Sequence, residues 1–267
     1  MSAPHAYAID RLPEVGPGAI CMGVFDGVHG GHLSLIAATV HAARERGASS
    51  VALVFDPHPD EVVHPGTVVP RLSPLADNLR RLRLAGIDHA VPVRFDAGLR
   101  SLTAEGFLDV LAPSIRLKAL VMTPEAAFGR NRAGTPDAMG SYGRAVGFDV
   151  ILADQVTDEL GPISSARIRA ALAAGELAAA TSMLGHPPYL EAALADPTEG
   201  GVQLGFAYAP ALPAPGRYRA VLHDPGDSRA SPREAILEVG ADSVARLAGL
   251  VGALPHEPTA IDVWPAP

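Results

Sequence analysis

The chain has 267 residues, of which 48% are hydrophobic and 19% charged, so it has ample apolar material for a folded core and wholesale disorder is excluded. Its formal net charge is −8 and it contains no basic run, which argues against a general nucleic-acid binder or a binder of acidic membranes. A single cysteine, Cys21, excludes an internal disulfide and any zinc site built from a cysteine cluster.

The amino-terminal segment carries no secretion signal that can be recognised in the sequence. Residues 1–18 lack both a basic segment and an apolar run, and no later stretch approaches the roughly 20 apolar residues of a membrane span. We therefore expect a soluble, cytoplasmic protein that binds neither membranes nor nucleic acid.

The first two thirds of the sequence alternate short apolar runs with helical patterns. Residues 18–25 are typical of a buried strand, and apolar residues three and four positions apart predict a helix over residues 31–46. Ser73 and Pro74 have the chemistry of a helix start, and another helix is expected from near Thr103. Further strands are predicted at residues 51–55, 87–93, 119–122 and 150–152. This alternation predicts an α/β fold with a Rossmann-like parallel sheet.

The pattern changes near residue 187. Short β-like runs follow, separated by clusters of Pro, Gly and Asp, with no crossover helix between them. These runs are residues 190–194, 202–208, 218–223 and 235–239. We therefore expect two domains: an α/β domain over residues 1–187 and a smaller antiparallel β-barrel-like or sandwich domain over residues 188–267.

The most specific segment is GVFDGVHGGH at residues 23–32, where a strand gives way to a helix through a glycine-rich turn. His29 and His32 fall at or just before the helix N-terminus, where free backbone N–H groups and the helix dipole favour an anion. Two imidazoles there can hold a polyphosphate and stabilise the charge that develops when a phosphoryl bond breaks. The plainer alternative is a glycine-rich turn with two partly exposed histidines.

This segment resembles the HxGH motif of the nucleotidyltransferase superfamily. It is most similar to the FMN adenylyltransferase (FAD synthetase) module of bacterial bifunctional riboflavin kinase/FAD synthetases. Three later segments resemble motifs of that family in the same order, namely LVFDPHP at 53–59, FGRNRAG at 128–134 and ISSARIR at 163–169. The resemblance covers about residues 18–188 and implies a nucleotidyltransferase domain followed by a riboflavin-kinase-like β domain.

The resemblance implies a reaction in which AMP is transferred in line from ATP to the phosphate of FMN, giving FAD and pyrophosphate. His29 and His32 would be the catalytic residues that contact the ATP phosphates. Mg²⁺ would bridge ATP oxygens with few ligands from the protein. The metal ligands of the protein and its oligomeric state stay open.

The resemblance assigns the binding of ATP and its phosphates to the first and fourth motifs. The residues implied are Gly23, Phe25, Asp26, Gly31, Ser164, Ser165, Arg167 and Arg169. Ser164 and Ser165 would cap a helix that runs from Ala166 and would present N–H groups to a phosphate, although a Ser-Ser pair alone is an ordinary N-cap. Asp26 either fixes the turn or approaches the metal, and we favour the turn.

The resemblance assigns the acceptor, or flavin, side to the second and third motifs. The residues implied are Phe55, His58, Pro59, Glu125, Phe128, Arg130 and Arg132. His58 lies between two prolines at a strand end, where crevices open in parallel sheets, so it either enters that crevice or is a solvated turn residue. Arg130 and Arg132 are either triphosphate contacts or ordinary surface arginines.

The sequence departs from the family pattern on the acceptor side. Thr123, Glu125 and Ala126 stand where the family usually has a glycine, an Asp or Asn, and an aromatic residue. Pro162 and Ala166 replace a basic residue and a threonine around the fourth motif. Two alternatives therefore stay open: nucleotidyl transfer to a different phosphorylated metabolite, and a non-catalytic flavin- or nucleotide-binding homologue.

The carboxy-terminal part departs further from the riboflavin-kinase module, which carries LGFPTAN. The stretch over residues 200–210 keeps LGF but has AYAP at 207–210 instead of PTAN, and the tail from Thr198 is shorter than a full kinase module. Glu234 and Glu238 are candidates for the catalytic glutamate, but neither lies in a convincing pattern. We therefore expect a barrel that has lost riboflavin kinase activity.

Overall fold

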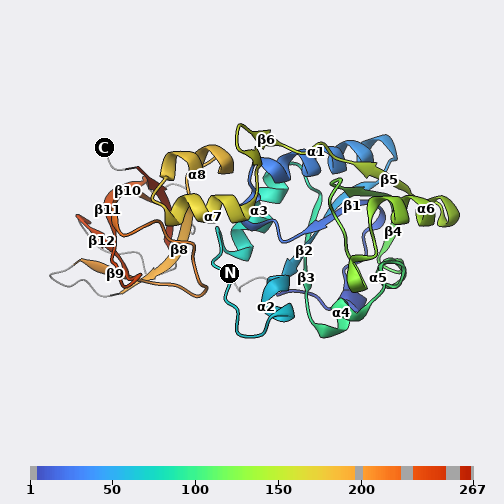
Figure 1. The fold of residues 1–267 in the computed structure, drawn as a ribbon, viewed down its shortest axis with the longest axis horizontal. Coiled ribbons are helices and arrows are strands. Elements are labelled where there is room, and N and C mark those ends of the chain that lie inside the picture. Colours follow the sequence, from blue (N-terminus) through green and yellow to red (C-terminus); the bar gives the residue numbers. More distant parts are fainter. Residues whose placement is uncertain (1–4, 196–200, 224–230, 251–258, 266–267) are drawn as a thin grey trace. The chain divides into compact units, whose positions relative to one another are not determined.

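The computed structural model describes residues 5–195, 201–223, 231–250 and 259–265 (Figure 1). The chain divides into two compact units, Met1–Val69 with Leu75–Pro162, and Pro70–Pro74 with Ile163–Pro267. Thr198 and residue 200, which entered the sequence comparison above, lie outside the described residues. Within the described ranges, none of the helices combines the length and the apolar character that crossing a membrane requires.

The first unit is built on a five-stranded sheet in the order β3-β2-β1-β4-β5, and all neighbouring strands are parallel. The strands are β1 (Gly16–Gly23), β2 (Ser49–Asp56), β3 (His89–Arg94), β4 (Ile115–Met122) and β5 (Asp149–Leu152). The strand order reverses between β1 and β4, which is where ligands bind in sheets of this kind. The predicted Rossmann-like α/β fold is confirmed.

Helices cover both faces of this sheet (Figure 1). One face packs against α1 (Gly30–Glu45) and α3 (Leu75–Leu84), and the other against α4 (Ala97–Ser101), α5 (Ala104–Leu111) and α6 (Pro136–Val146). Because both faces are buried, β1 and β2 are apolar on both sides rather than alternating. The short helix α2 (Pro59–Val63) follows β2, and a small hairpin joins β6 (Thr157–Asp158) to β7 (Gly161–Pro162).

Several boundaries differ from the sequence prediction. The strand expected over residues 18–25 is β1, which ends at Gly23, because Phe25 adopts a left-handed conformation (φ 52°) and leads into the 3-10 turn η2 (Asp26–Val28). The helix expected from Ser73 and Pro74 begins at Leu75. Helix α6 was not predicted, although Thr135 accepts a hydrogen bond from the Ala138 N–H at its start.

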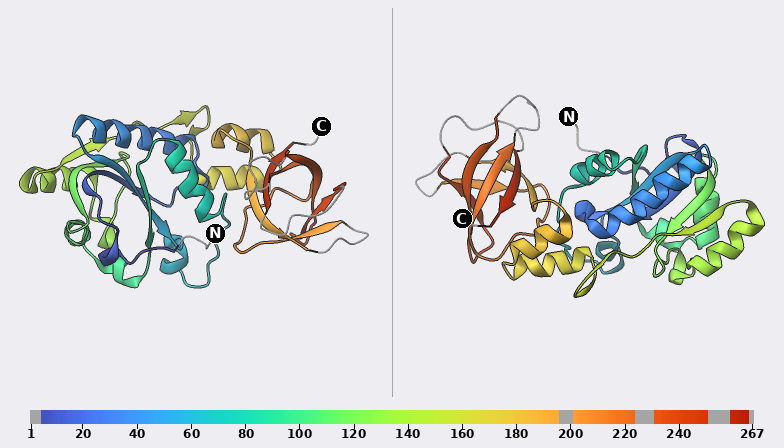
Figure 2. Two further views of the ribbon diagram at one scale, coloured as in Figure 1. Left: turned by 180° about the vertical axis from the view of Figure 1, so that it is seen from behind. Right: turned by 90° about the horizontal axis from the view of Figure 1, so that it is seen from above.

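The second unit contains helices α7 (Ser165–Ala173) and α8 (Leu177–Leu184) and a closed antiparallel barrel, drawn in orange to red in Figure 2. The barrel order is β10-β11-β12-β9-β8-β13. Its strands are β8 (Tyr189–Leu194), β9 (Val202–Gly205), β10 (Gly216–His223), β11 (Arg233–Val239), β12 (Ala245–Ala248) and β13 (Thr259–Trp264). The predicted β-barrel is confirmed, and β12 and β13 are strands that the sequence pattern missed.

The interior of the barrel is filled by its own side chains. Alternate residues of β11 are buried, and similar positions on the other strands supply aliphatic side chains to the same core. The core includes Leu190, Leu204, Leu222, Leu237, Leu247 and Ile261. The short segment Pro70–Pro74 belongs to this unit, since Arg71 makes backbone hydrogen bonds with Ala209 (2.8 Å) and Ala211 (2.7 Å).

Candidate active site

Three of the four motifs follow the carboxyl ends of neighbouring strands in the first unit. Residues 23–32 follow β1, residues 55–59 end β2, and residues 123–134 follow β4. Because the strands are parallel, these ends lie at one edge of the sheet, and β1 and β4 flank the point where the strand order reverses. The topology therefore brings three sequence motifs to the edge where a ligand is expected.

The turn after β1 has an unusual backbone. Phe25 (φ 52°), Gly27 (φ 78°) and Val28 (φ 42°) all lie in the left-handed region, and a β-branched residue such as valine is a rare occupant of it. Each such non-glycine residue costs on the order of 1–3 kcal/mol and persists only where the surroundings hold it. Phe25 and Val28 are buried in the core beneath α1 and α3, and this packing stabilises the turn.

The turn places the two histidines at the start of α1. His29 is the N-cap and His32 is the third residue of the helix, so their predicted location is confirmed. Their rings stack with centroids 3.7 Å apart and planes inclined by 22°. The ring of Phe25 lies 5.1 Å from that of His32, so this predicted ATP-binding residue packs against the histidine pair. His29 is only 4% exposed, whereas His32 is partly exposed.

The surroundings of His32 favour its neutral form. Burial, and after it the neighbouring imidazole of His29, hold the pKa of His32 well below its ordinary value. In the part of the chain that the structure describes, the buried Nδ1 of His32 has no hydrogen-bond partner. A ligand that forms a hydrogen bond with this nitrogen would satisfy a buried polar atom that the protein itself leaves unsatisfied.

The start of α1 adds a positive electrostatic potential. The helix has 16 residues, and no side chain caps its N-terminus. The His32 N–H already donates to the His29 carbonyl at 2.8 Å, so the N–H groups that precede the helical hydrogen-bond pattern are those of Gly30 and Gly31, which leave the backbone uncovered by side chains. Asp26 is buried in the turn, and it is the only carboxylate in the 23–32 motif. Two imidazoles and a helix N-terminus together form a site suited to a phosphate group.

Phenylalanines connect the second and third motifs. Phe55 and Phe128 each make an edge-to-face contact with Phe107 of α5, with centroid distances of 6.5 and 5.5 Å. Phe55 also contacts Phe95 at 5.6 Å. Phe55 and Phe128 are partly exposed, so the structure brings these two predicted acceptor residues to one aromatic cluster. The sequence analysis missed Phe107, whose only signal was its apolar position in a helix.

His58 and Pro59 begin a short helix rather than a free loop. His58 is the N-cap of α2, and its Nδ1 accepts a hydrogen bond from the Asp60 N–H at 3.2 Å. Its side chain is 14% exposed, so it is not a fully solvated turn residue. Pro59 is the first residue of α2, where its missing N–H has no cost.

The FGRNRAG loop packs closely on the start of α5. A Cβ on Gly129 would lie 2.6 Å from the backbone nitrogen of Ala104, and one on Gly134 would lie 2.6 Å from the Ala104 Cβ. The Arg130 N–H donates to the Leu102 carbonyl at 2.7 Å. The glycines of this motif therefore serve packing, while the side chains of Arg130 and Arg132 are exposed. Glu125, in the turn before the loop, is exposed as well.

The fourth motif lies in the second unit. Ser164 is the N-cap of α7, and its hydroxyl accepts a hydrogen bond from the Arg167 N–H at 3.3 Å. The helix begins at Ser165, one residue before the predicted start at Ala166. Arg167 and Arg169 lie in the first turns of this helix and are partly buried. The contact of these four residues with ATP stays a prediction.

Comparison with known proteins gives consistent matches. The model of the FAD synthetase family matches residues 13–167. The bifunctional riboflavin kinase/FMN adenylyltransferase of Escherichia coli (strain K12) is 34% identical over 204 residues, which are 76% of this chain and 65% of that protein. The protein of the same description from Listeria monocytogenes is 30% identical over 208 residues, or 77% and 65% of the two chains. The match therefore spans 65% of the length of each of these two relatives, which is just under two thirds.

A solved structure shares the fold. The crystal structure described as a macrolide-efflux protein from Streptococcus pneumoniae superposes with a TM-score of 0.84 over 97% of this chain and 90% of that chain. The two sequences are 21% identical, so this likeness concerns the arrangement of the elements alone.

Proposed function

The chain belongs to the FAD synthetase family, and we propose that it transfers AMP from ATP to the phosphate of FMN, giving FAD and pyrophosphate. One observation carries the proposal. A stacked pair of imidazoles, His29 and His32, lies at the uncapped N-terminus of α1, at the edge of the sheet where the strand order reverses. This is an arrangement suited to a triphosphate.

In the proposed reaction, a phosphate oxygen of FMN attacks the α-phosphorus of ATP, and the bond from that phosphorus to the bridging oxygen of pyrophosphate breaks. Negative charge builds up on the departing pyrophosphate and on the oxygens of the α-phosphate. His29 and His32 donate hydrogen bonds to these oxygens, and the N–H groups of α1 stabilise the same charge. No covalent intermediate with the protein is needed, because both partners are held in line.

We propose that ATP enters the site as its magnesium complex. The ion supplies charge neutralisation on the triphosphate. Among the described residues there is no group of three or more metal-binding side chains, so the ion would take most of its ligands from phosphate oxygens. Asp26, the only carboxylate of the 23–32 motif, is buried in the turn and is assigned to holding that turn.

We propose that the flavin ring of FMN binds at the aromatic cluster of Phe55, Phe107 and Phe128. Phe55 and Phe128 are partly exposed and offer a stacking surface for a flat ring, and the buried Phe107 supports both from beneath. His58, Arg130 and Arg132 belong to the same two motifs and would contact the polar part of the acceptor. A different phosphorylated acceptor is the second candidate, favoured by Ala126, which stands where the family usually has an aromatic residue and so removes stacking area for a flavin ring.

We also propose that the barrel has no riboflavin kinase activity. Glu234 and Glu238 point away from the buried core of β11 and form ion pairs with Arg219 and Arg217 on β10. Tyr208, in the AYAP tetrapeptide, accepts a hydrogen bond from the Glu191 N–H at 3.2 Å through its hydroxyl. These contacts support a structural role for the residues that stand in place of a kinase site.

An acceptor panel tests the proposed function. Purified protein is incubated with ATP and Mg²⁺, and pyrophosphate release is followed with FMN or with other phosphorylated metabolites as the acceptor. We expect FMN to give the highest kcat/KM, with FAD identified by chromatography. A higher kcat/KM for another acceptor would establish the second candidate, and no acceptor-dependent pyrophosphate release would contradict both.

A further inference from the structure

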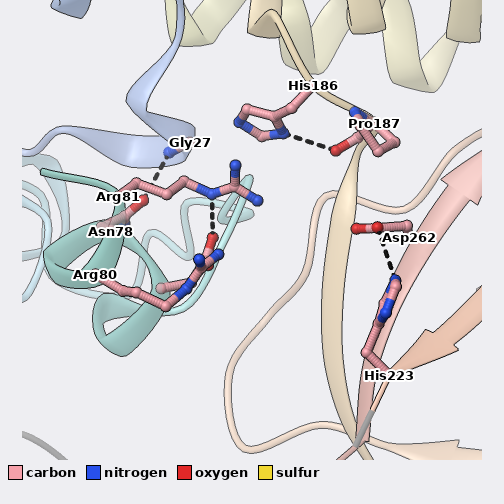
Figure 3. A network of polar contacts seen from close by, with 9 residues as sticks. Gly27, Asn78, Arg80, Arg81, His186, Pro187, His223 and Asp262 are labelled. Atoms are coloured by element: carbon pink, nitrogen blue, oxygen red, sulfur yellow. Dashed lines mark hydrogen bonds and ion pairs between the residues drawn. The ribbon is translucent and has the colours of Figure 1, made fainter. Parts of the chain in front are cut away.

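A buried amide side chain holds the turn that carries the two histidines. Asn78 of α3 is 4% exposed, and its Oδ1 accepts a hydrogen bond from the Gly27 N–H at 2.9 Å. Figure 3 shows this amide directed at Gly27. The two residues are 51 positions apart, and Asn78 lies in none of the four motifs.

The turn needs such a contact because its backbone is strained. Phe25, Gly27 and Val28 are all left-handed, and the side chains of Phe25 and Val28 are held by apolar packing. Apolar packing is not directional, so it holds these side chains in the core without fixing the orientation of the neighbouring peptide planes. The hydrogen bond from Gly27 to Asn78 is directional, and it fixes the peptide two residues before His29.

The helix that carries Asn78 is itself held firmly at this point. The carboxylate of Asp77 is 1% exposed and makes contacts of 2.6 Å with both Arg80 and Arg81, one turn further along α3. Charge-assisted bonds of this length are strong, and they join the first and second turns of the helix. The amide of Asn78 therefore presents its oxygen to Gly27 from a rigid element.

We propose that Asn78 is a positioning residue for nucleotidyl transfer. By holding Gly27 it fixes the turn that sets the direction of the His29 and His32 imidazoles toward the triphosphate. This inference rests on the proposed function. Asn78 acts through Gly27 and the histidines and is not itself proposed to touch a substrate.

The chemistry of the side chain predicts how substitutions behave. Asn78→Ala removes the oxygen that accepts the hydrogen bond from the buried Gly27 N–H. Asn78→Asp keeps an acceptor at the same place but adds a negative charge close to where the triphosphate is proposed to bind. The two variants therefore separate the loss of the hydrogen bond from a change of charge.

The test measures the turn and the activity independently. Hydrogen exchange followed by mass spectrometry reports the protection of peptides that cover residues 23–32, and steady-state assays report kcat and the KM for ATP. Ser114→Ala is the matched control, because the Ser114 hydroxyl also donates to a distant backbone group, the Leu12 carbonyl at 3.1 Å, near the amino end of β4. Should Asn78→Ala not fold, Asn78→Ser takes its place.

For Asn78→Ala we expect faster exchange over residues 23–32 and a fall of about 10²-fold in kcat, because a displacement on the order of 1 Å at the reacting groups has an effect of this size. Asn78→Asp should restore the protection and most of kcat, with a raised KM for ATP. Ser114→Ala should change neither the exchange of these peptides nor kcat.

Two results would overturn the inference. Unchanged exchange in Asn78→Ala would show that the amide does not hold the turn, and faster exchange with unchanged kcat would show that the turn does not need it for catalysis. If the wild-type protein makes no FAD from ATP and FMN, the proposed function fails and the positioning role fails with it. In that case, faster exchange in Asn78→Ala would still show that Asn78 holds the turn, so the failure would lie with the proposed function.

Discussion

His32 is a titratable side chain whose protonation state is set by its immediate surroundings. Its ring is stacked on His29 at 3.7 Å and lies against Phe25, and burial lowers its pKa well below the ordinary value of 6.5. The free protein therefore holds a neutral imidazole that can donate one hydrogen bond. A bound triphosphate would favour the charged form and raise this pKa again.

The lowered pKa of His32 predicts a dependence of stability on pH. Below about pH 6.5 the unfolded chain binds a proton at His32 that the folded protein does not, so the free energy of unfolding should fall with falling pH. His32→Gln lacks this proton, so its free energy of unfolding should decrease less steeply with falling pH than that of the wild type. The difference between the two slopes should be up to about 1.4 kcal/mol per pH unit. Urea unfolding between about pH 7.5 and about pH 5.5 measures it. Identical slopes for the wild type and His32→Gln would contradict a lowered pKa of His32 in the folded protein.

Cys21 offers a second test at this scale. Its thiol lies on β1 within the core, and burial raises its pKa to about 12, so the reactive thiolate is nearly absent at neutral pH. We expect no reaction of the folded protein with a thiol reagent and one reacting thiol per chain after denaturation. Rapid labelling of the native protein would show that β1 opens readily, against the packing described here.

Among the elements, the loop of the third motif depends on its glycines for packing on α5. Gly129→Ala places a Cβ about 2.6 Å from the Ala104 backbone nitrogen at a φ of +72°. Because backbone atoms cannot move aside cheaply, we expect a loss of about 1–3 kcal/mol in the free energy of unfolding, measured by chemical denaturation.

The control for this prediction is Gly140→Ala in the interior of α6. There the new Cβ would meet only the Arg144 Nη1 atom at 3.7 Å, so alanine should stabilise the helix by up to about 1 kcal/mol. Equal effects of the two substitutions would contradict the packing of the loop on α5.

Most elements with a strong local pattern were predicted, with α6 as an exception, and those set by distant contacts were not. The alternation of apolar runs and helical periodicity located β1 to β5 and α1 because each carries its signal within its own residues. The end of β1 was placed two residues late, since nothing local in Phe25 indicates a left-handed conformation. Strand β13 pairs with β10 and β8, which lie far along the chain, and β12 is closed into the barrel by the distant β9 as well as by the neighbouring β11.

The same distinction holds for the candidate site. The sequence placed His29 and His32 correctly at the start of α1, because the glycine-rich turn between a strand and a helix is a local signal. It missed Phe107 and Asn78, which reach the site from other elements and carry no motif of their own. Long-range hydrogen bonds and ring contacts follow from tertiary packing, which a single sequence does not display.

At the scale of the whole molecule, the family relation covers the α/β unit more securely than the barrel. The family model matches residues 13–167, whereas the barrel strands follow from residue 189. Inside the described part of the barrel the side chains form a closed aliphatic core, and the two candidate glutamates are paired on its outside. The barrel is therefore proposed to stabilise the chain without phosphorylating riboflavin.

This proposal predicts the outcome of a kinase assay. With riboflavin and magnesium ATP, the protein should form neither FMN nor ADP above the rate of a sample without protein, because AYAP replaces PTAN at residues 207–210 and both candidate glutamates lie on the outside of the barrel. Chromatography of the flavins measures FMN directly. A riboflavin-dependent formation of FMN would contradict the loss of kinase activity while leaving the proposed AMP transfer untouched.

The most direct test of the central claim is the formation of FAD in wild-type protein and in His29→Ala. With ATP, Mg²⁺ and FMN, the wild type should release one pyrophosphate for each FAD formed, and His29→Ala should retain the fold while its kcat falls by about 10²–10³-fold. The absence of FAD with the wild type, or an unchanged kcat in a folded His29→Ala protein, would contradict the role given to the stacked histidines.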